Sequence, residues 1–341
     1  MSNHALLFEG PGQLSVAEID ERPLEPTEVR VKSDSVGICG SDVHGFTGAN
    51  RRRVAGMIMG HEAAGIVSER GADVGNPELG ARVVLNPAVT CETCEFCRAG
   101  EDHRCPHRRL YGCVLDLPGA FADSFVVQAR NLVEFDGPAP LEWGALVEPF
   151  AVGDHGVGLL PQALEHVLVI GGGPIGVGAA LSARRRGFER VVLAEPNEHR
   201  RRIAEALGLE TFDPTGSDAE PDPFDAAVEC VAVPATLDSA LRLTRPGGEI
   251  VVVGLGPTEM PFSVERLVVG ERVMRGSFNY SRQDFARVAA WISQGEVDMG
   301  PVIEARVDLE GIVDAFRGYA DGSYAAMKTL FQPEPSRGGF A

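Results

Sequence analysis

Residues 166–176, HVLVIGGGPIG, run from an apolar, strand-like segment into three glycines and on into a helix-like segment. In the pattern Gly-x-Gly-x-x-Gly, the first glycine permits a tight turn and the second lets the backbone approach a diphosphate. The third lets the helix pack closely on the strand, and the first amides of that helix attract anions. The stretch therefore predicts a dinucleotide-binding loop, with cofactor contacts at Gly171, Gly173, Pro174, Ile175 and Gly176.

The sequence after this loop continues to alternate apolar strands with helices, which indicates parallel strands joined by crossover helices. The next strand, RVVLAE, ends at Glu195, 19 residues beyond Gly176. An acidic residue at this place accepts hydrogen bonds from the adenosine ribose and repels a 2′-phosphate, so we expect NAD as cofactor. Arg200 follows closely and keeps NADP possible. A glycine turn with an incidental glutamate is the alternative interpretation.

Residues 1–150 have a different character, because they are rich in glycine and proline and contain short β-branched runs such as 28–31 and 81–85. Short strands with closely spaced turn signals predict a β-rich, barrel-like domain. A chain of 341 residues is long enough for about two domains with separate cores.

The net charge of −18, from 31 basic and 49 acidic residues, disfavours nucleic acid and anionic lipid surfaces as partners. No leader-like segment opens the sequence and no window approaches ~18 uninterrupted apolar residues, so we expect a soluble, cytoplasmic protein without a membrane span. Two arginine runs, 51–53 and 184–186, are expected on solvated faces. The second precedes Gly187 and would place positive charge on the last turn of a helix.

Four of the seven cysteines lie within 15 residues, at Cys91, Cys94, Cys97 and Cys105. Disulfides are improbable in a reducing cytosol, whereas four thiolates on one short loop suit a tetrahedral structural Zn²⁺. An iron–sulfur cluster is the alternative, but its bacterial pattern needs a last gap of three residues instead of seven, and a second cysteine set is missing. We expect a zinc lobe over about residues 88–108.

The stretch GICGSDVH, residues 37–44, contains one more cysteine, Cys39. His61 and Glu62 follow 22 residues later, and Glu148 precedes the nucleotide-binding half. Cysteine, histidine and carboxylate from separate loops can hold a Zn²⁺ with one position open, which is the arrangement of a catalytic site. Taken singly, each has an ordinary alternative as a buried cysteine, a satisfied core histidine or a surface charge.

The motifs GICGSDVH, GHEAAGIV, the four-cysteine lobe, ALVEPFAV and VIGGGPIG occur in this order along the chain. In this order they resemble the zinc-dependent medium-chain dehydrogenase/reductase family, and within it the polyol (sorbitol) and threonine dehydrogenase branch. The resemblance implies an α/β protein with a β-rich GroES-like catalytic domain, residues 1–152 and 280–341. A doubly wound Rossmann domain with a parallel sheet would occupy residues 153–279.

The resemblance also implies that Cys39, His61 and Glu62 lie at the catalytic zinc. Glu148 stands where classical alcohol dehydrogenases have a second cysteine, and whether Glu62 or Glu148 binds the metal directly stays open. Ser41 would hydrogen-bond the substrate oxygen and His44 would pass the proton to solvent. Both could instead belong to a cluster that caps the start of a helix.

The function implied is hydride transfer between a secondary alcohol, polyol or sugar-like alcohol and NAD, with two zinc ions per chain. The substrates would be a small alcohol and its ketone, and the enzyme would be a homodimer or homotetramer. The alternatives are L-threonine 3-dehydrogenase, an NADPH-dependent ketone reductase and, more remotely, a catalytically silent binding protein. The silent alternative predicts a missing ligand, and each catalytic ligand position is filled.

Overall fold

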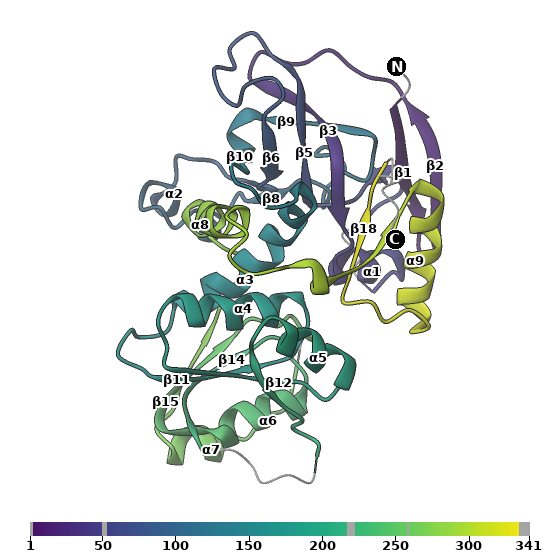
Figure 1. Ribbon diagram of the computed structural model, residues 1–341. Coiled ribbons are helices and arrows are strands. Elements are labelled where there is room, and N and C mark those ends of the chain that lie inside the picture. Colours follow the sequence, from purple (N-terminus) through teal and green to yellow (C-terminus); the bar gives the residue numbers. More distant parts are fainter. Residues whose placement is uncertain (1–2, 50–52, 217–221, 258, 334–341) are drawn as a thin grey trace. The chain divides into compact units, whose positions relative to one another are not determined.

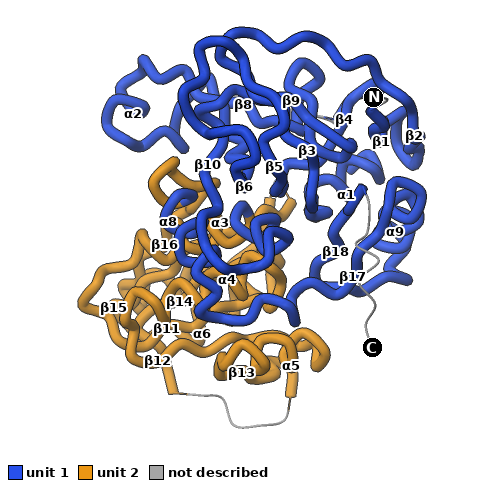
Figure 2. Tube along the Cα trace, turned by 45° about the horizontal axis from the view of Figure 1, so that its top comes forward, with its two compact units in different colours: residues 1–148, 285–341 blue, residues 149–284 orange. Residues whose placement is uncertain are grey.

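The computed structural model describes residues 3–49, 53–216, 222–257 and 259–333. The chain forms two compact units, residues 1–148 with 285–341, and residues 149–284 (Figure 2). The sequence placed the boundaries at 152/153 and 279/280. In the structure they lie in the first turns of α3 (Val147–Gly158) and α8 (Arg282–Ser293). A helix that begins in one unit and continues in the other leaves no change of composition at the boundary.

The first unit is built on a seven-stranded sheet whose central strand, β3 (Glu28–Gly37), is buried over most of its length. The strand order is β10 (Leu132–Glu134), β6 (Arg82–Leu85), β5 (Glu62–Arg70), β3, β18 (Lys328–Phe331) and β17 (Ile303–Val307), with β9 (Ser124–Gln128) also pairing with β3. A second sheet has the order β2 (Gln13–Ile19), β1 (Asn3–Gly10) and β4 (Met57–Ile58).

The C-terminal segment completes this N-terminal unit. Phe316, on α9 (Leu309–Asp321), meets Phe121 edge-to-face with ring centroids 5.9 Å apart, and Phe331 on β18 meets the same ring at 6.2 Å. All three rings are fully buried, and each brings about 2 kcal/mol or more of apolar burial. Burial of these rings ties β18 to β3, and Figure 1 shows the two strands side by side.

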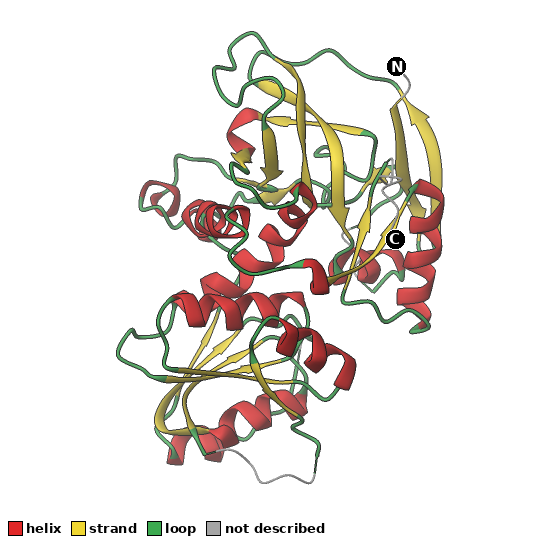
Figure 3. Cartoon of the chain, in the orientation of Figure 1, coloured by secondary structure: helices red, strands yellow, loops and turns green. Residues whose placement is uncertain are grey.

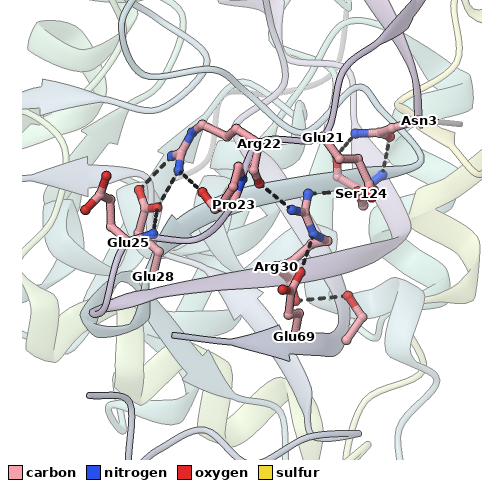
Figure 4. A network of polar contacts seen from close by, with 10 residues as sticks. Asn3, Glu21, Arg22, Pro23, Glu25, Glu28, Arg30, Glu69 and Ser124 are labelled. Atoms are coloured by element: carbon pink, nitrogen blue, oxygen red, sulfur yellow. Dashed lines mark hydrogen bonds and ion pairs between the residues drawn. The ribbon is translucent and has the colours of Figure 1, made fainter. Parts of the chain in front are cut away.

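A network of ion pairs borders the start of β3 (Figure 4). Arg22 donates to both carboxylate oxygens of Glu28, at 2.6 and 2.7 Å, and this lowers the pKa of Glu28. Arg30 donates to Glu69 on β5 at 2.9 Å. These contacts fix the connection that leads into the central strand.

The cysteine-rich lobe predicted at 88–108 is a small folded excursion from this unit. Its two ends, β7 (Ala88–Val89) and β8 (Arg109–Leu110), pair antiparallel. Between them lie α2 (Glu95–Arg98) and η1 (Asp102–Arg104).

The second unit is a six-stranded parallel sheet with helices on both faces (Figure 3). The strand order is β13 (Glu210–Phe212), β12 (Arg190–Ala194), β11 (His166–Ile170), β14 (Phe224–Glu229), β15 (Thr244–Val252) and β16 (Val273–Gly276). The flanking helices are α4 (Pro174–Arg185), α5 (Glu198–Ala206), α6 (Pro234–Leu243) and α7 (Val264–Val269). The predicted fold class, a β-rich unit with a doubly wound parallel sheet, is confirmed.

The strand order reverses between β11 and β14, and open α/β sheets bind ligands at the carboxyl ends of the strands beside such a reversal. The remaining elements are short: α1 (Gly40–Phe46), η2 (Ala129–Asn131), η3 (Leu141–Leu146) and η4 (Gly300–Val302). Within the described part of the chain, each helix is too short or too polar to cross a membrane.

The arginine run at 184–186 follows the prediction only in part. Arg184 and Arg185 are exposed at the end of α4, before Gly187. Arg186 instead turns inward and pairs with the buried carboxylate of Asp154, with 3.0 Å between Nη2 and Oδ2. The expectation of a solvated face is therefore wrong for Arg186.

Candidate metal centres and cofactor site

The first candidate centre brings together Cys39, His61 and Glu62, whose ligand atoms all lie within 4.8 Å of one another. Sheet register places them, because Gly37 at the end of β3 pairs with Glu62 at the start of β5. Cys39 is the N-cap of α1 and is partly exposed, whereas His61 and Glu62 are buried. A thiolate, an imidazole and a carboxylate with one open side are ligands suited to a catalytic zinc.

The surroundings of His61 fit a bound cation. Its Nδ1 is buried without a hydrogen-bond partner among the described residues and lies 3.5 Å from Oδ1 of Asp42. Burial opposes protonation of the ring, but the charges of Asp42, Cys113 and Cys39 raise the pKa of His61 well above its ordinary value. A field that favours a proton on the ring also favours a metal ion beside it.

A buried ion pair lies behind this histidine. Asp42 is fully buried in α1, and its Oδ1 accepts from Nη2 of Arg53 at 3.0 Å. The stem of Arg53 packs over Gly45, where a Cβ would lie 2.4 Å from its Cγ. Burial raises the pKa of Asp42, but His61 and Arg53 lower it more, so the carboxylate is charged.

This pair corrects the prediction of a solvated arginine run at 51–53. Arg53 is only 7% exposed, because it neutralises a carboxylate that the sheet has buried. Residues 51 and 52 lie outside the described residues.

The other residues predicted for this centre lie on two helices. Ser41 donates to Sγ of Cys39 at 3.4 Å, and His44 stands three residues further along α1, exposed in its last turn. Residues three apart share one face of a helix, so Ser41 and His44 point to the same side. Glu148, in the first turn of α3, is partly exposed and is not in the group with Cys39, His61 and Glu62.

The second candidate centre is the cysteine lobe, where the four sulfurs gather without forming disulfides. The Sγ atoms of Cys94 and Cys97 are 3.5 Å apart, those of Cys91 and Cys105 are 3.5 Å apart, and those of Cys91 and Cys97 are 4.0 Å apart. Four zinc–sulfur bonds of about 2.3 Å in a tetrahedron separate the sulfurs by about 3.8 Å, so the cluster has the size of a zinc site.

Backbone amides already favour charge in this cluster. The amides of Thr93 and Cys94 lower the pKa of Cys91 to about 6, while burial and the neighbouring sulfurs raise the pKa of Cys97 to about 12. The thiol of Cys91 therefore ionises more readily than that of Cys97, and a divalent cation would favour the charged form of both.

The glycine loop between β11 and α4 has the local geometry that its sequence predicts. Gly171 has a φ of +105°, which a residue with a side chain rarely adopts, and a Cβ on Gly176 would lie against the carbonyl oxygen of Gly171. Nothing lies within 4 Å of a Cβ placed on Gly173, the N-cap of α4. Pro174 and Ile175 form the partly exposed first turn of that helix. The loop therefore leaves open space at a helix N-terminus, where a diphosphate binds.

Glu195 lies immediately after β12 and next to this loop. Its Oε2 accepts from the amide of Gly172 at 2.7 Å and its Oε1 from the amide of Asn197 at 2.8 Å. Arg201 is engaged with the carbonyl oxygens of Glu195 and Pro196. Nε of Arg200 is buried without a hydrogen-bond partner in the described structure.

Comparison with known proteins identifies the family. The alcohol dehydrogenase GroES-like domain matches residues 25–137, and the zinc-binding dehydrogenase model matches residues 174–294. The chain is 34% identical to 2-dehydro-3-deoxy-L-galactonate 5-dehydrogenase of Pseudoalteromonas atlantica over 89% of this chain and 91% of that protein. It is a zinc-dependent medium-chain dehydrogenase.

A second relative is L-idonate 5-dehydrogenase of Vitis vinifera. It is 32% identical to this chain over 90% of this chain and 88% of that protein. Among solved structures, a zinc-binding dehydrogenase of Sinorhizobium meliloti 1021 bound to NADP aligns with a TM-score of 0.89 and 28% identity. The alignment covers 98% of this chain and 100% of the other. These findings confirm the predicted family, the enzyme class of an NAD(P)-dependent alcohol or polyol dehydrogenase, and zinc and a nicotinamide dinucleotide as cofactors.

Sequence reasoning missed two buried cations of the dehydrogenase, Arg53 and Lys328. Arg53 is the last of three consecutive arginines, and a run of like charges predicts solvent exposure for all of its members. Lys328 binds Glu62 from the far end of the chain. It could have been noticed by rarity, because only two of the 31 basic residues are lysines.

Proposed function

We propose that Cys39, His61 and Glu62 hold the catalytic zinc of this dehydrogenase. The observation that carries the proposal is the grouping of their ligand atoms within 4.8 Å, with the cysteine partly exposed. Glu62 is favoured over Glu148 as the carboxylate of the centre because only Glu62 belongs to this group. The four-cysteine lobe would hold the structural zinc, which makes two zinc ions per chain.

When bound, zinc supplies Lewis acidity that lowers the pKa of an alcohol, and the nicotinamide supplies the hydride acceptor. The chain's own residues position and deprotonate the alcohol. Ser41, beside Cys39, would bind the substrate hydroxyl and receive its proton, and His44 on the same face of α1 would release it to solvent. Asp42, held by Arg53, would fix the orientation of the His61 ring.

The favoured substrate is an acyclic polyol or sugar acid with a secondary hydroxyl next to a terminal hydroxymethyl group. Both relatives described above are named as 5-dehydrogenases of six-carbon sugar acids, whose carbon 5 has this surrounding. The test is a panel of L-idonate, L-galactonate, sorbitol, L-threonine and 2,3-butanediol, each with NAD and with NADP. The highest kcat/KM is expected with a sugar acid or polyol. A clear preference for L-threonine, or for 2,3-butanediol with NADP, would replace this proposal.

NAD is the favoured cofactor because Glu195 places a buried negative charge beside the glycine loop. A reducing compartment such as the cytoplasm is the favoured location, since the seven cysteines, all within the described residues, form no disulfide.

We further propose that the second unit associates with another copy through β16, the edge strand of its sheet. Large apolar side chains are exposed in and around this edge, which is unusual for a surface that meets only water. They are Leu255, Phe262, Val264, Val268, Val269, Val273 and Phe278. Light scattering should give a dimer or tetramer at micromolar concentration, and Val269→Asp should shift it toward the monomer. A wild-type monomer would refute this assembly.

A further inference from the structure

Lys328 is chemically unusual in this chain. Of 31 basic residues, 29 are arginines and only Lys32 and Lys328 are lysines. Lys32 is exposed on β3, whereas Lys328, at the start of β18, is 2% exposed. The one lysine that the fold buries therefore lies in a chain that otherwise uses arginine for almost every positive charge.

The ammonium of Lys328 joins two segments of the candidate zinc centre. Its Nζ donates to Oε2 of Glu62 at 2.5 Å and to the carbonyl oxygen of Ile38, the residue before Cys39, at 3.1 Å. Glu62 is 1% exposed, so both charges of the pair are withdrawn from water. Removing two charges from water costs several kcal/mol each unless they are paired in good geometry.

Gly37 provides the space through which the two side chains meet. In the sheet it pairs with Glu62 on one side and with Leu330 of β18 on the other. A Cβ at this position would lie 2.2 Å from Oε2 of Glu62 and 3.2 Å from Cδ of Lys328. The first glycine of GICGSDVH is therefore explained by this contact.

The geometry also explains why a lysine serves here. An ammonium is a compact charge on a slender stem, whereas the planar guanidinium of arginine presents five donors in a rigid fork. Two acceptors converge on Nζ in this slot, a carboxylate oxygen and a carbonyl oxygen. Burial opposes the charge, but Glu62 and Cys39 raise the pKa of Lys328.

We propose that Lys328 is a positioning residue of the zinc centre, which holds the Glu62 carboxylate and the backbone carrying Cys39 in the arrangement that binds the metal. This inference rests on the proposed function, in which Cys39, His61 and Glu62 bind zinc. It assigns to a residue of the last described strand a role in metal retention. The four-cysteine lobe would not depend on it.

The first experiment measures zinc retention with a chromophoric chelator. In Lys328→Met we expect one of two zinc ions to be bound about 10–100-fold more weakly, as when supporting partners of metal ligands are removed, while the other is unchanged. Gly37→Ala should act in the same direction, because its methyl group separates the pair without removing either charge. Lys32→Met is the matched control and should retain both ions as the wild type does. Normal retention in both Lys328→Met and Gly37→Ala would overturn the inference.

The second experiment uses the wild-type protein, so it does not depend on the folding of a variant. With ¹³C-labelled lysine, only two side-chain signals are expected in an NMR spectrum, and Lys32→Met assigns them by elimination. On removal and return of zinc, the signal of Lys328 should shift reversibly and that of Lys32 should not. An unresponsive Lys328 signal would contradict the proposed role.

The variant Cys39→Ala separates this inference from the proposed function. If it still holds two zinc ions, the metal is bound elsewhere and both proposals fail. If it loses one ion while Lys328→Met keeps both with wild-type affinity, only the role of Lys328 is wrong. Lys328→Arg retains the charge with a different shape, and a partial recovery of zinc retention would separate the effect of charge from that of geometry.

Discussion

Two buried glutamates, Glu62 and Glu195, lie at the two candidate sites and are stabilised in different ways. Glu62 is held by the full positive charge of Lys328, 266 residues away in the sequence. Glu195 is held by two backbone amides. The amide of Asn197 belongs to the loop after its own strand, β12, and the amide of Gly172 belongs to the loop after the neighbouring strand, β11. The pairing of the strands determines where both carboxylates lie. The groups that stabilise their charges are an ammonium for Glu62 and backbone amides for Glu195.

The difference has a chemical meaning. Amide dipoles stabilise a carboxylate without cancelling its charge, so Glu195 continues to repel a phosphate and attract hydroxyl groups. The ammonium of Lys328 offsets part of the charge of Glu62 and holds its carboxylate in place beside a centre that already contains a thiolate. We therefore expect the metal centre to depend on distant charged residues, and the nucleotide site to depend on local backbone geometry.

The largest effect should come from the thiolate of the metal centre. Cys39→Ala should lower kcat/KM by about 10³-fold or more, equivalent to about 4 kcal/mol of lost transition-state stabilisation, with the fold retained. Cys94→Ala, in the lobe, should mainly lower the melting temperature, because its zinc contributes to folding. Steady-state kinetics and thermal unfolding of both variants provide the measurement. Equal behaviour of the two variants would remove the distinction between a catalytic and a structural centre.

A smaller but still large effect is expected from the charge pair behind His61. Arg53→Met should leave Asp42 buried without its cation and lower the free energy of unfolding by about 3–5 kcal/mol. The control is Arg317→Met, which breaks an exposed pair with Asp314 and should change stability by less than about 1 kcal/mol. Chemical denaturation measures the free energy of unfolding of both variants. A small decrease for Arg53→Met would contradict the view that the metal centre depends on charged residues distant in the sequence.

At the nucleotide site, Glu195→Ser should change the cofactor preference. Loss of the carboxylate removes hydrogen bonds to the ribose, at about 1 kcal/mol or more each, and relieves repulsion of a 2′-phosphate. The ratio of kcat/KM for NAD to that for NADP should fall about tenfold or more. Glu198→Ser, at the exposed start of α5, is the control and should leave the ratio unchanged. A wild type that prefers NADP would show that Glu195 does not face the ribose.

The smallest effect is expected for Asp225, a carboxylate on β14 of the parallel sheet that is stabilised mainly by neighbouring backbone amides and one arginine. Asp225 accepts from the amides of Glu165 and His166 and from Arg245. Burial raises the pKa of Asp225, but Arg245 and the amides outweigh it and lower the pKa to about 2. Asp225→Asn should lower stability by about 1 kcal/mol at pH 7, after allowance for solvent screening.

The pH dependence has a definite sign. Because the folded-state pKa of Asp225 is below its unfolded value of about 4, its contribution is complete above about pH 4 and disappears as the pH falls toward 2. Unfolding free energies of the wild type and the variant should therefore converge in this range. A difference that stays constant down to pH 2 would show that the charge of Asp225 is unimportant.

Much of the fold, the glycine turn and the gathering of four cysteines could be predicted from the sequence, because their geometry is local. Gly171 to Gly176 and Cys91 to Cys105 act through short spacings that a reader can measure along the chain. Arg53 and Lys328 could not be predicted, since their partners are determined by which strands pair. Gly37 pairs with both β5 and β18 because of the strand order of the whole sheet. Spacing along the sequence does not predict that order.

The burial of Lys328 also determines how this protein meets amine-directed chemistry. Reagents that acylate primary amines can reach Lys32, the exposed residue of β3, while the ammonium of Lys328 lies inside the first unit. Protein molecules coupled to a support through Lys32 would therefore all be attached by the same side chain.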